Sequence, residues 1–470
     1  MKQKFDIKNI IMAVILMIIG VGGVTAASIY LGKDIGYDNT GTNLKSDNVQ
    51  DAIDEIYEKL TADTSCDVVA PPKIVDGLVP VTIADDGTVK AVSQDDSSWY
   101  NYCEKKWANA VILSSGSYTA GQTIPESVIE TYLVWIPKYK YQLWNISQTA
   151  EKKAHSINIV FDTVNTTDGT TSCATPMTSG NSGNCHNGDF MTHPAFISMN
   201  VNGFWVGKFE TGYKGATSTS AAQVNANDSS KIIVKPNTYS WRNNTVMNMF
   251  LSAYNYKRNM NSHMMKNTEW GAVAYLSHSQ YGIDYEVNIN NNSSYKTGYS
   301  SLLTIQQGTY PGTYGDGASY NKAYNTSIGY LASTTGNISG VYDMAGGAHE
   351  YMASYSAVGS SGFSDSTIAN YDSKYFDVYN ASSGETTYQY RILGDATGEM
   401  GPFVDYKDGD GTSRHHNQWY GDYSLFVQSS DPWFRRGGHY SFGVLAGQFS
   451  FHRGRGGVDT YVGARLVLAP

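Results

Sequence analysis

The first apolar run of the chain lies directly behind a cluster of lysines. Lys2, Lys4 and Lys8 precede a hydrophobic stretch over about residues 10–31. A basic start followed by an apolar run is typical of an export signal, and this run is also just long enough to span a bilayer. Small residues near its end fit a cleavage site, so residues 1–32 are predicted to be a signal peptide or, if uncleaved, a membrane anchor. Either alternative places the rest of the chain outside the cytoplasm, in the extracellular space or at the cell surface.

A short amphipathic helix is the next periodic feature, in the polar spacer of residues 33–65. Its apolar residues recur at helical spacing at Val49, Ile53, Ile56 and Leu60. Ser46 or Asp47 can cap its N-terminus. A single helix of this length is marginally stable in isolation. We therefore expect the helix at 47–60 to pack on another surface, and packing on copies of itself would make a homo-oligomer.

From residue 66 onward, strand-like runs replace the helical periodicity. Residues 66–130 combine glycine turns with β-branched runs such as Val79–Ile83 and are predicted to be a small β-rich segment. From about residue 131, short apolar runs alternate with long Asn, Ser, Gly and Thr loops, and the clearest helix is predicted over 266–276. No repeat of roughly 20–50 residues is visible, which argues against a solenoid or propeller. The pattern predicts a loop-rich α+β domain over residues 131–470.

The composition and charge narrow the range of partners. Charged residues make up only 16% of the chain, whereas it contains 36 Tyr and 47 Gly together with abundant Asn, Ser and Thr. Tyr, Ser, Gly and Asn are the residues that adaptable binding surfaces use most. The net charge is −9, and phosphate binding needs a basic surface. The sequence therefore argues against nucleic acid as a partner.

The cysteine count fits an oxidising compartment. Four cysteines, an even number in an exported chain, permit two disulfides. Cys173 and Cys185 would close a loop rich in Gly, Ser and Asn, so we favour this pair, which leaves Cys66 to pair with Cys103. None of the four has C-x-x-C spacing, so no zinc site is predicted.

Four motifs follow one another along the C-terminal part of the chain. They lie at residues 203–211, 265–275, 340–351 and, as a closing pair, 434–438 with 463–468. The second is similar to "LPTEAEWEYAA", the third to "GLYDMAGNVWEW" and the closing pair to "RGGSW…GFRLV" of the formylglycine-generating-enzyme (sulfatase-modifying-factor) family. The resemblance implies an irregular α+β fold of the C-type-lectin-like kind for residues 131–470.

The chemistry of that enzyme family is not expected in this chain. Its enzymes bind copper through a pair of cysteines in their C-terminal third, and a soft ion such as Cu(I) needs thiolate ligands. No cysteine follows Cys185. His349-Glu350 lacks the second histidine of an H-E-x-x-H metal site, and it stands where the family has a structural Trp-Glu, which predicts a packing role. We expect a protein without catalytic residues.

Two polar clusters resemble metal-binding sequences without matching one. His415 and His416 form an isolated pair in a polar loop, which is more typical of solvated residues. Asp405, Asp408 and Asp410 lack the register and the final Glu of an EF-hand loop. No cofactor and no metal ligand is predicted, with a structural calcium ion as the alternative.

The pattern of residues 437–464 fits neither a helix nor a strand. Glycines, Ala446, Phe449 and Phe451 alternate there with His, Tyr, Ser, Phe, Val, Leu, Arg, Asp and Thr side chains, and each of these nine residue types can be reached by changing only the adenines of an Asn codon. Lys, Glu, Met and Trp cannot be reached in this way, and none occurs in the segment. This resembles the variable region of diversity-generating-retroelement target proteins, which display mutable residues on a C-type-lectin fold. The alternative is an ordinary closing hairpin.

The resemblance to these variable proteins implies a ligand-binding surface in residues 437–464, which we call the tail. Aromatic and Arg side chains are enriched at interface hot spots, and an aromatic ring can also stack on a sugar. The candidate residues are His439, Tyr440, Ser441, Phe442, Val444, Leu445, His452, Arg453, Arg455, Val458, Asp459, Thr460 and Tyr461.

The sequence as a whole predicts a non-catalytic, surface-displayed ligand-binding protein of the adhesin or receptor type. Its ligand is expected to be a protein or a glycan. The alternatives are a formylglycine-generating-type oxidase, against which the missing C-terminal cysteines count, and a structural surface or fibre subunit that assembles through the helix at 47–60. The mass in solution would distinguish the fibre subunit from a monomeric binder.

Overall fold

The computed structural model describes residues 48–53, 69–144, 154–162, 187–301, 321–357, 365–379, 419–425 and 427–470. The chain divides into two compact units, Met1–Ser65 and Cys66–Pro470. Among the described residues, no helix is both long enough and apolar enough to cross a membrane. The predicted signal peptide or anchor at 1–32 lies outside the described residues.

The described part of the first unit is one helical turn. The backbone N–H of Ala52 donates to the carbonyl of Asn48 at 3.0 Å, and the Asn48 side chain accepts from the N–H of Asp51 at 2.9 Å. Asn48 therefore takes the capping position next to the predicted caps, Ser46 and Asp47, which lie outside the described residues together with most of the helix predicted at 47–60. Assembly through this helix stays a prediction.

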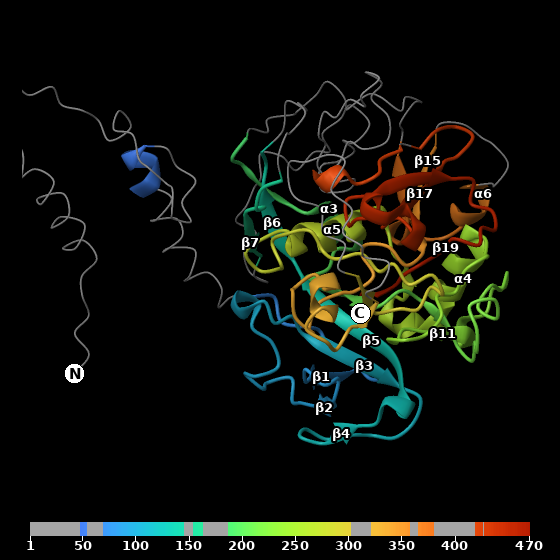
Figure 1. Cartoon of the computed structure of the whole chain (residues 1–470), viewed down its shortest axis with the longest axis horizontal. Coiled ribbons are helices and arrows are strands. Elements are labelled where there is room, and N and C mark those ends of the chain that lie inside the picture. Colours follow the sequence, from blue (N-terminus) through green and yellow to red (C-terminus); the bar gives the residue numbers. More distant parts are fainter. Residues whose placement is uncertain are drawn as a thin grey trace, which may run out of the picture. The chain divides into compact units, whose positions relative to one another are not determined.

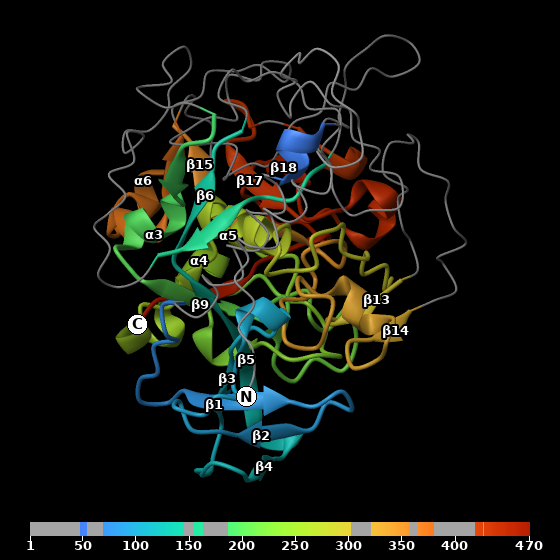
Figure 2. The same ribbon diagram turned by 90° about the vertical axis from the view of Figure 1, so that its left-hand side faces the viewer.

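An antiparallel eight-stranded sheet organises the second unit (Figures 1 and 2). Its order is β12 (His263–Met264), β20 (Leu466–Leu468), β9 (Gly203–Gly207), β5 (Ile129–Pro137), β3 (Asn109–Leu113), β1 (Val79–Ile83), β2 (Val89–Ala91) and β4 (Thr123–Ile124). β5 is a nine-residue strand, buried at every position but one, and it pairs with β3 on one side and β9 on the other. Because β3 pairs with β5, the β-rich segment expected at 66–130 is continuous with the domain expected from 131 onward.

A second sheet carries the C-terminal part of the chain. Its order is β16 (Asp377–Tyr379), β15 (His349–Ser356), β17 (Trp433–Arg436) and β18 (Phe451–Gly454), and β19 (Val462–Gly463) pairs with β15 in parallel. β15 is buried at all eight positions, which makes it the centre of this sheet. The predicted variable segment at 437–464 therefore follows β17, forms the edge strand β18 and then pairs through β19 with the central strand β15.

Three small sheets and several short helical turns complete the unit. The sheets are β7 (Ile159–Phe161), β6 (Tyr139–Gln142) and β8 (Phe190–Thr192); β10 (Gly212–Tyr213) with β11 (Ile232–Ile233); and β13 (Tyr299–Ser300) with β14 (Lys322–Ala323). The 3-10 turns are Tyr102–Glu104, Glu126–Val128, Ser229–Lys231, Arg258–Met260, Gly329–Ala332, Ser373–Tyr375, Trp419–Gly421 and Tyr440–Leu445, of which the last is η11.

In the described part of the second unit, the α-helices are few and short. They are α3 (Pro194–Met199), α4 (Val246–Tyr256), α5 (Asn267–Ser277) and α6 (Asp365–Ile368). α5 confirms the helix predicted over 266–276; it is buried at every position, and in both views it lies between β15 and β5 (Figures 1 and 2). The described residues thus form a mainly β, loop-rich α+β domain, as the sequence predicted.

One continuous apolar cluster fills the domain from the first sheet to the second. Its largest fully buried side chains include seven tryptophans: Trp99, Trp107, Trp135, Trp205, Trp270, Trp419 and Trp433. Trp135 of β5 and Trp205 of β9 are cross-strand partners whose ring centroids are 5.2 Å apart. Large aromatic side chains bury much apolar area each, so a chain with little regular structure still forms a substantial core.

Cys103 is disulfide-bonded. Cys66, Cys173 and Cys185 lie outside the described residues. The pairings Cys66–Cys103 and Cys173–Cys185 therefore stay predictions.

Candidate ligand-binding site

A buried arginine joins three of the motifs found in the sequence. Arg465 makes a two-point contact with Glu350 of β15, with Nη2–Oε1 at 2.6 Å and Nε–Oε2 at 3.0 Å. Its other donors reach the carbonyls of Gly207 at 2.9 Å and Asp343 at 3.0 Å. Two-point arginine–carboxylate contacts fix orientation as well as supplying energy. Arg465 therefore holds the end of the chain against both sheets, and Glu350 has the packing role that the sequence predicted.

The turn that leads into β15 is held by a second buried carboxylate. Glu210 accepts from the N–H of Ala348 at 2.8 Å and from the hydroxyl of Ser240. Gly347 adopts a φ of 67°, and a Cβ at this position would clash with the Glu210 carboxylate. Burial first, and then the charges of Asp343 and Glu350, raise the pKa of Glu210 well above its ordinary value. This glycine turn delivers His349 to the start of β15.

Trp270 of α5 holds the tail from behind. Its indole Nε1 donates to the carbonyl of Gln448 at 2.7 Å, and its ring lies 5.6 Å from the Arg436 guanidinium and 5.9 Å from that of Arg465. Arg436 in turn donates to the carbonyl of Ser450 at 2.9 Å. The backbone of 448–450 is thus bound to a buried helix and a buried strand, which gives the tail a rigid support.

A buried aspartate fixes the turn before β18. Asp422 accepts from the N–H of Phe449 at 2.9 Å, and a Cβ on Gly447 would clash with its carboxylate. Burial raises the pKa of Asp422 to about 8, although its backbone hydrogen bonds and Arg436 oppose the rise. Only glycine fits at position 447 with the carboxylate in this place. The turn therefore depends on the pair Asp422 and Gly447.

The tail separates buried supporting residues from outward side chains. The supporting residues, which we call the tail frame, are buried: Gly437, Gly438, Ala446, Gly447, Phe449, Phe451, Gly454, Gly456 and Gly463. Between them the candidate binding residues are exposed or half-buried, apart from His439 and Val444, which are 8% and 2% exposed. His439 and Val444 were expected to face outward, and this part of the prediction is wrong, because η11 folds both side chains back onto the domain.

The outward aromatic side chains gather around η11. We define the aromatic surface as Tyr440, Phe442, His452 and Tyr461, with the buried His439 beneath them. The His439 ring lies 4.3 Å from Phe442 and 4.8 Å from Tyr461, centroid to centroid. The structure thus brings together residues that are up to 22 positions apart in the sequence (461 minus 439).

One half-buried tyrosine from outside the tail, Tyr423, extends this surface, and the buried Tyr295 supports it from beneath. Tyr423 stacks on His452 with centroids 5.1 Å apart and planes 13° apart, and Tyr295 meets Tyr440 edge to face at 4.9 Å. Neither was a candidate in the sequence. Tyr295 lies in an Asn- and Ser-rich loop, and no local pattern distinguishes it from the other 35 tyrosines of the chain.

The charged candidates lie in ion pairs at one side of the tail. Arg455, which is 78% exposed at its side chain, and Arg453 both contact Asp431, at 3.3 and 3.8 Å. Asp459 pairs with Arg435 at 3.0 Å. Exposed ion pairs contribute little net stability, so a ligand can exchange the partner of the exposed Arg455 at small cost. The other exposed candidates are Ser441, Val458 and Thr460, and Leu445 is half-buried.

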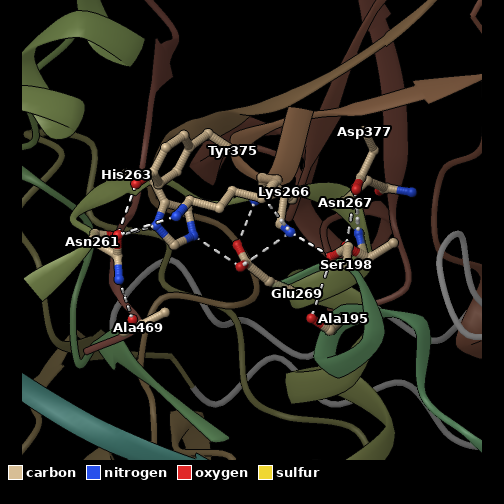
Figure 3. A network of polar contacts seen from close by, with 12 residues as sticks. Ala195, Ser198, Asn261, His263, Lys266, Asn267, Glu269, Tyr375, Asp377 and Ala469 are labelled. Carbon is tan, nitrogen blue, oxygen red and sulfur yellow. Dashed lines mark hydrogen bonds and ion pairs between the residues drawn. The ribbon is translucent and has the colours of Figure 1, made fainter. Parts of the chain in front are cut away.

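A separate network of buried polar groups closes the start of α5 (Figure 3). Glu269 lies between His263, whose Nε2 is 2.8 Å from its Oε1, and Lys266, whose backbone N–H donates to it at 2.9 Å. The ammonium of Lys266 donates to Ser198 at 2.6 Å, and Asp377 accepts from the N–H of Thr268 at 3.0 Å. Each of these buried charges has a partner, so we assign the network to holding the helix.

Metal binding has no support among the residues that the structure describes. In those parts of the chain, no group of three His, Cys, Asp or Glu side chains is placed to hold an ion. His415, His416, Asp405, Asp408 and Asp410 lie outside them. The structural calcium ion stays an untested alternative.

Comparisons with known proteins give only distant likenesses. No protein-family model matches the chain, so the resemblance to the formylglycine-generating-enzyme family has no counterpart there, and no curated protein matches it. Among solved structures, the Major Tropism Determinant I1 variant aligns over 86% of this chain and 74% of its own, with 11% identity and a TM-score of 0.29. The Major Tropism Determinant P3c variant aligns over 85% and 74%, with 12% identity and a TM-score of 0.27. Similarity this weak carries no argument, so the function is argued from the chain's own residues.

Proposed function

We propose that this chain is a non-catalytic ligand-binding protein of the adhesin or receptor type, displayed outside the cell, that binds a protein or glycan through its aromatic surface. One observation carries the proposal: in the tail, buried frame residues alternate with outward side chains of mixed chemistry. Binding residues on loops that a rigid support positions are the usual arrangement of recognition sites.

The chemistry of the aromatic surface suits recognition. Tyr and His rings present large, stiff contact areas with polar edges, and they lose little conformational entropy on binding. Exposed aromatic patches mark interaction sites more often than isolated apolar residues do. Arg455 and Asp459 at the side of the surface add charges of both signs.

We further propose that residues 131–470 form a C-type-lectin-like domain of the formylglycine-generating-enzyme type, with the tail as a diversified region. The contacts of Arg465 with Glu350, Gly207 and Asp343 support the fold, because they join the family-like motifs to one another. The division between frame and outward residues supports the diversified region. A mutable surface needs positions whose change leaves the support intact.

A binding comparison of three proteins tests the proposed function. The full chain, the variant Tyr440→Ala/Tyr461→Ala and the control Tyr118→Ala are applied to a glycan array and to a panel of bacterial cells. Tyr118 is half-buried and lies in the segment between β3 and β4. The strand β4 is at the other end of the domain from β17 and β18 (Figures 1 and 2). We expect the double variant to lose at least about 10-fold in affinity, since interface tyrosines are frequent hot spots. Equal binding by all three proteins would exclude the aromatic surface as the site.

A further inference from the structure

Three histidines from three separate elements meet beneath the aromatic surface. His349 begins β15, His439 precedes η11, and His452 lies in β18. The ring of His349 is 5.0 Å from that of His439 and 5.5 Å from that of His452, centroid to centroid. Phe442 contacts all three, at 4.9 Å from His349, 4.3 Å from His439 and 6.4 Å from His452. We call these three imidazoles the histidine cluster.

The groups that face the cluster offer little compensation for added positive charge. Arg435 of β17 lies near enough to act on His349 and His439. The carboxylate that acts on His439 is Asp459, and it already pairs with Arg435 at 3.0 Å. Glu350 follows His349 directly in β15, but it is bound at two points by Arg465, so it does not compensate for a charge on the cluster. A proton on any one of the histidines adds a second cation to this site.

The phenolic groups around the cluster do not supply a negative charge either. Tyr461 lies against His439, Tyr423 stacks on His452 at 5.1 Å, and Tyr440 lies 6.0 Å from His439. The Tyr351 hydroxyl accepts from the Arg435 guanidinium at 2.7 Å. A neutral phenol can stack on a neutral imidazole, but it cannot neutralise an imidazolium. The surroundings of the cluster therefore favour the neutral form of its three imidazoles.

Protonation would also break a specific hydrogen bond. The Nδ1 atom of His439 lies 2.9 Å from the Ser441 hydroxyl and 3.4 Å from the Ser441 N–H, and it accepts from that N–H as the N-cap of η11. A protonated imidazole carries a hydrogen on both ring nitrogens and accepts at neither. Charging His439 therefore removes the cap of the turn that carries Tyr440 and Phe442.

We propose that the histidine cluster makes the aromatic surface acid-sensitive, so that η11 is held closed at neutral pH and opens in acid, releasing the ligand. The part that concerns the ligand rests on the proposed function, whereas the opening of η11 is a property of the chain alone.

The pH range follows from the groups in the cluster. Burial first, and then the positive neighbours His452 and Arg435, lower the pKa of His439 from 6.5 to about 4 against the opposing effect of Asp459. Burial and the same two neighbours lower the pKa of His349 well below its ordinary value. A histidine whose pKa is lower in the closed state stabilises that state fully above pH 6.5, and this stability is lost as the pH falls towards 4. From His439 alone, the opening equilibrium at pH 4.5 rises on the order of 10- to 100-fold over its value at pH 7.

Hydrogen exchange of the full chain tests the opening without any ligand. Protection of the amides of 439–446 is measured by mass spectrometry at pH 7 and pH 4.5, corrected for the intrinsic pH dependence of exchange, with α5 as the internal reference. We expect protection of 439–446 to fall on the order of 10- to 100-fold in acid while α5 keeps its protection. Unchanged protection of 439–446 would overturn the proposal.

Two variants and a control assign the effect to the cluster. His439→Asn keeps a capping side chain but cannot titrate, and His349→Phe replaces a buried ring with another ring. Each should reduce the acid-induced loss of protection at least about 5-fold, and a result from either suffices if the other fails to fold. The control His155→Phe changes a half-buried histidine that packs on Trp144 and Trp419 instead, and it should behave as the wild type does. Identical behaviour of the cluster variants and the control would overturn the proposal.

The outcomes separate this inference from the proposed function. If residues 439–446 open in acid but the chain binds neither the array nor the cells, the acid-sensitive turn is supported and the proposed function is rejected. If Tyr440→Ala/Tyr461→Ala abolishes binding but residues 439–446 do not open in acid, the proposed function is supported and the acid-sensitive turn is rejected.

Discussion

Replacing Arg465 by Met should be among the most damaging changes to this fold. The substitution removes both contacts with Glu350 and both backbone contacts, to Gly207 and Asp343, from a site with no solvent access. Breaking a buried pair by removing one partner costs about 3–5 kcal/mol, and the two carbonyls left without donors add about 1 kcal/mol each. We expect the free energy of unfolding to fall by about 5 kcal/mol, a large share of a typical domain's stability.

The assay is urea unfolding followed by tryptophan fluorescence, with Arg455→Met as the matched control. Arg455 is 78% exposed at its side chain, so the same substitution there should change the free energy of unfolding by less than about 0.5 kcal/mol. The double variant Glu350→Gln/Arg465→Met should recover at least about 1 kcal/mol, because it no longer buries an uncompensated carboxylate. A loss below about 1 kcal/mol for Arg465→Met would refute this account of the frame.

The pH dependence of the same variant gives a second signature. Burial raises the pKa of Glu350 to about 7 even though Arg465 opposes the rise, and without Arg465 the pKa must rise further. A carboxyl whose pKa is raised in the folded state favours folding at low pH, and this contribution is lost as the pH rises. The penalty of Arg465→Met should therefore be larger at pH 8 than at pH 5. Equal penalties at both pH values would contradict the charged pairing.

Three further predictions concern the turn before β18 and the start of α5. Gly447→Ala should lower the free energy of unfolding by about 2 kcal/mol or more, because the added Cβ displaces the Asp422 carboxylate. Urea unfolding measures this loss, and an unchanged midpoint would contradict the clash. Burial raises the pKa of Asp422 to about 8, so its own contribution to stability is lost as the pH rises from 4 towards 8. The effect of Asp422→Asn on the melting temperature should therefore be larger at pH 4 than at pH 8. Although burial raises the pKa of Glu269, the charges of His263 and Lys266 lower it below 4.5, so its contribution is present above pH 4.5 and is lost in acid. Glu269→Gln should cost about 3–5 kcal/mol at pH 7 by leaving Lys266 buried without its carboxylate, and the difference from wild type should shrink towards pH 3.

Local patterns in the sequence predicted several elements correctly. The helix predicted over 266–276 is confirmed as α5, in which Glu269 lies three positions after the cap, Lys266. α4 was missed, although Val246, Met249, Phe250 and Ala253 are buried at helical spacing behind a Thr cap. That signal was available, and the Asn-rich surroundings concealed it.

Pairings between distant segments could not be predicted. β20 inserts between β12 and β9, and Arg465 meets Glu350 across 115 positions. Such contacts depend on how the whole chain closes on itself, which no short window of sequence encodes. For the same reason the segment at 66–130 appeared separate, although it joins the larger sheet through β3 and β5.

The sequence indicated which tail side chains face outward, whereas ligand binding by them stays a prediction. The alternation in the tail identified most of the outward side chains, but it gave no sign that η11 would bury His439 and Val444. Tyr423 extends the surface and the buried Tyr295 packs beneath it from another loop, and only the folded chain shows these contacts. The histidine cluster is likewise invisible in the sequence, since its members lie in three elements and 90 positions separate His349 from His439 (439 minus 349).

The central claim is that a fixed frame displays changeable ligand-binding residues, and sequencing the DNA around the gene tests it most directly. We expect a reverse transcriptase gene and a near-copy of the 3′ end that differs from the gene only at adenines. The differences should fall on the codons of outward residues such as Tyr440, Phe442 and Tyr461 and should spare frame codons such as those of Phe449 and Phe451. A complete genome without such a copy, or differences concentrated on the frame codons, would contradict it.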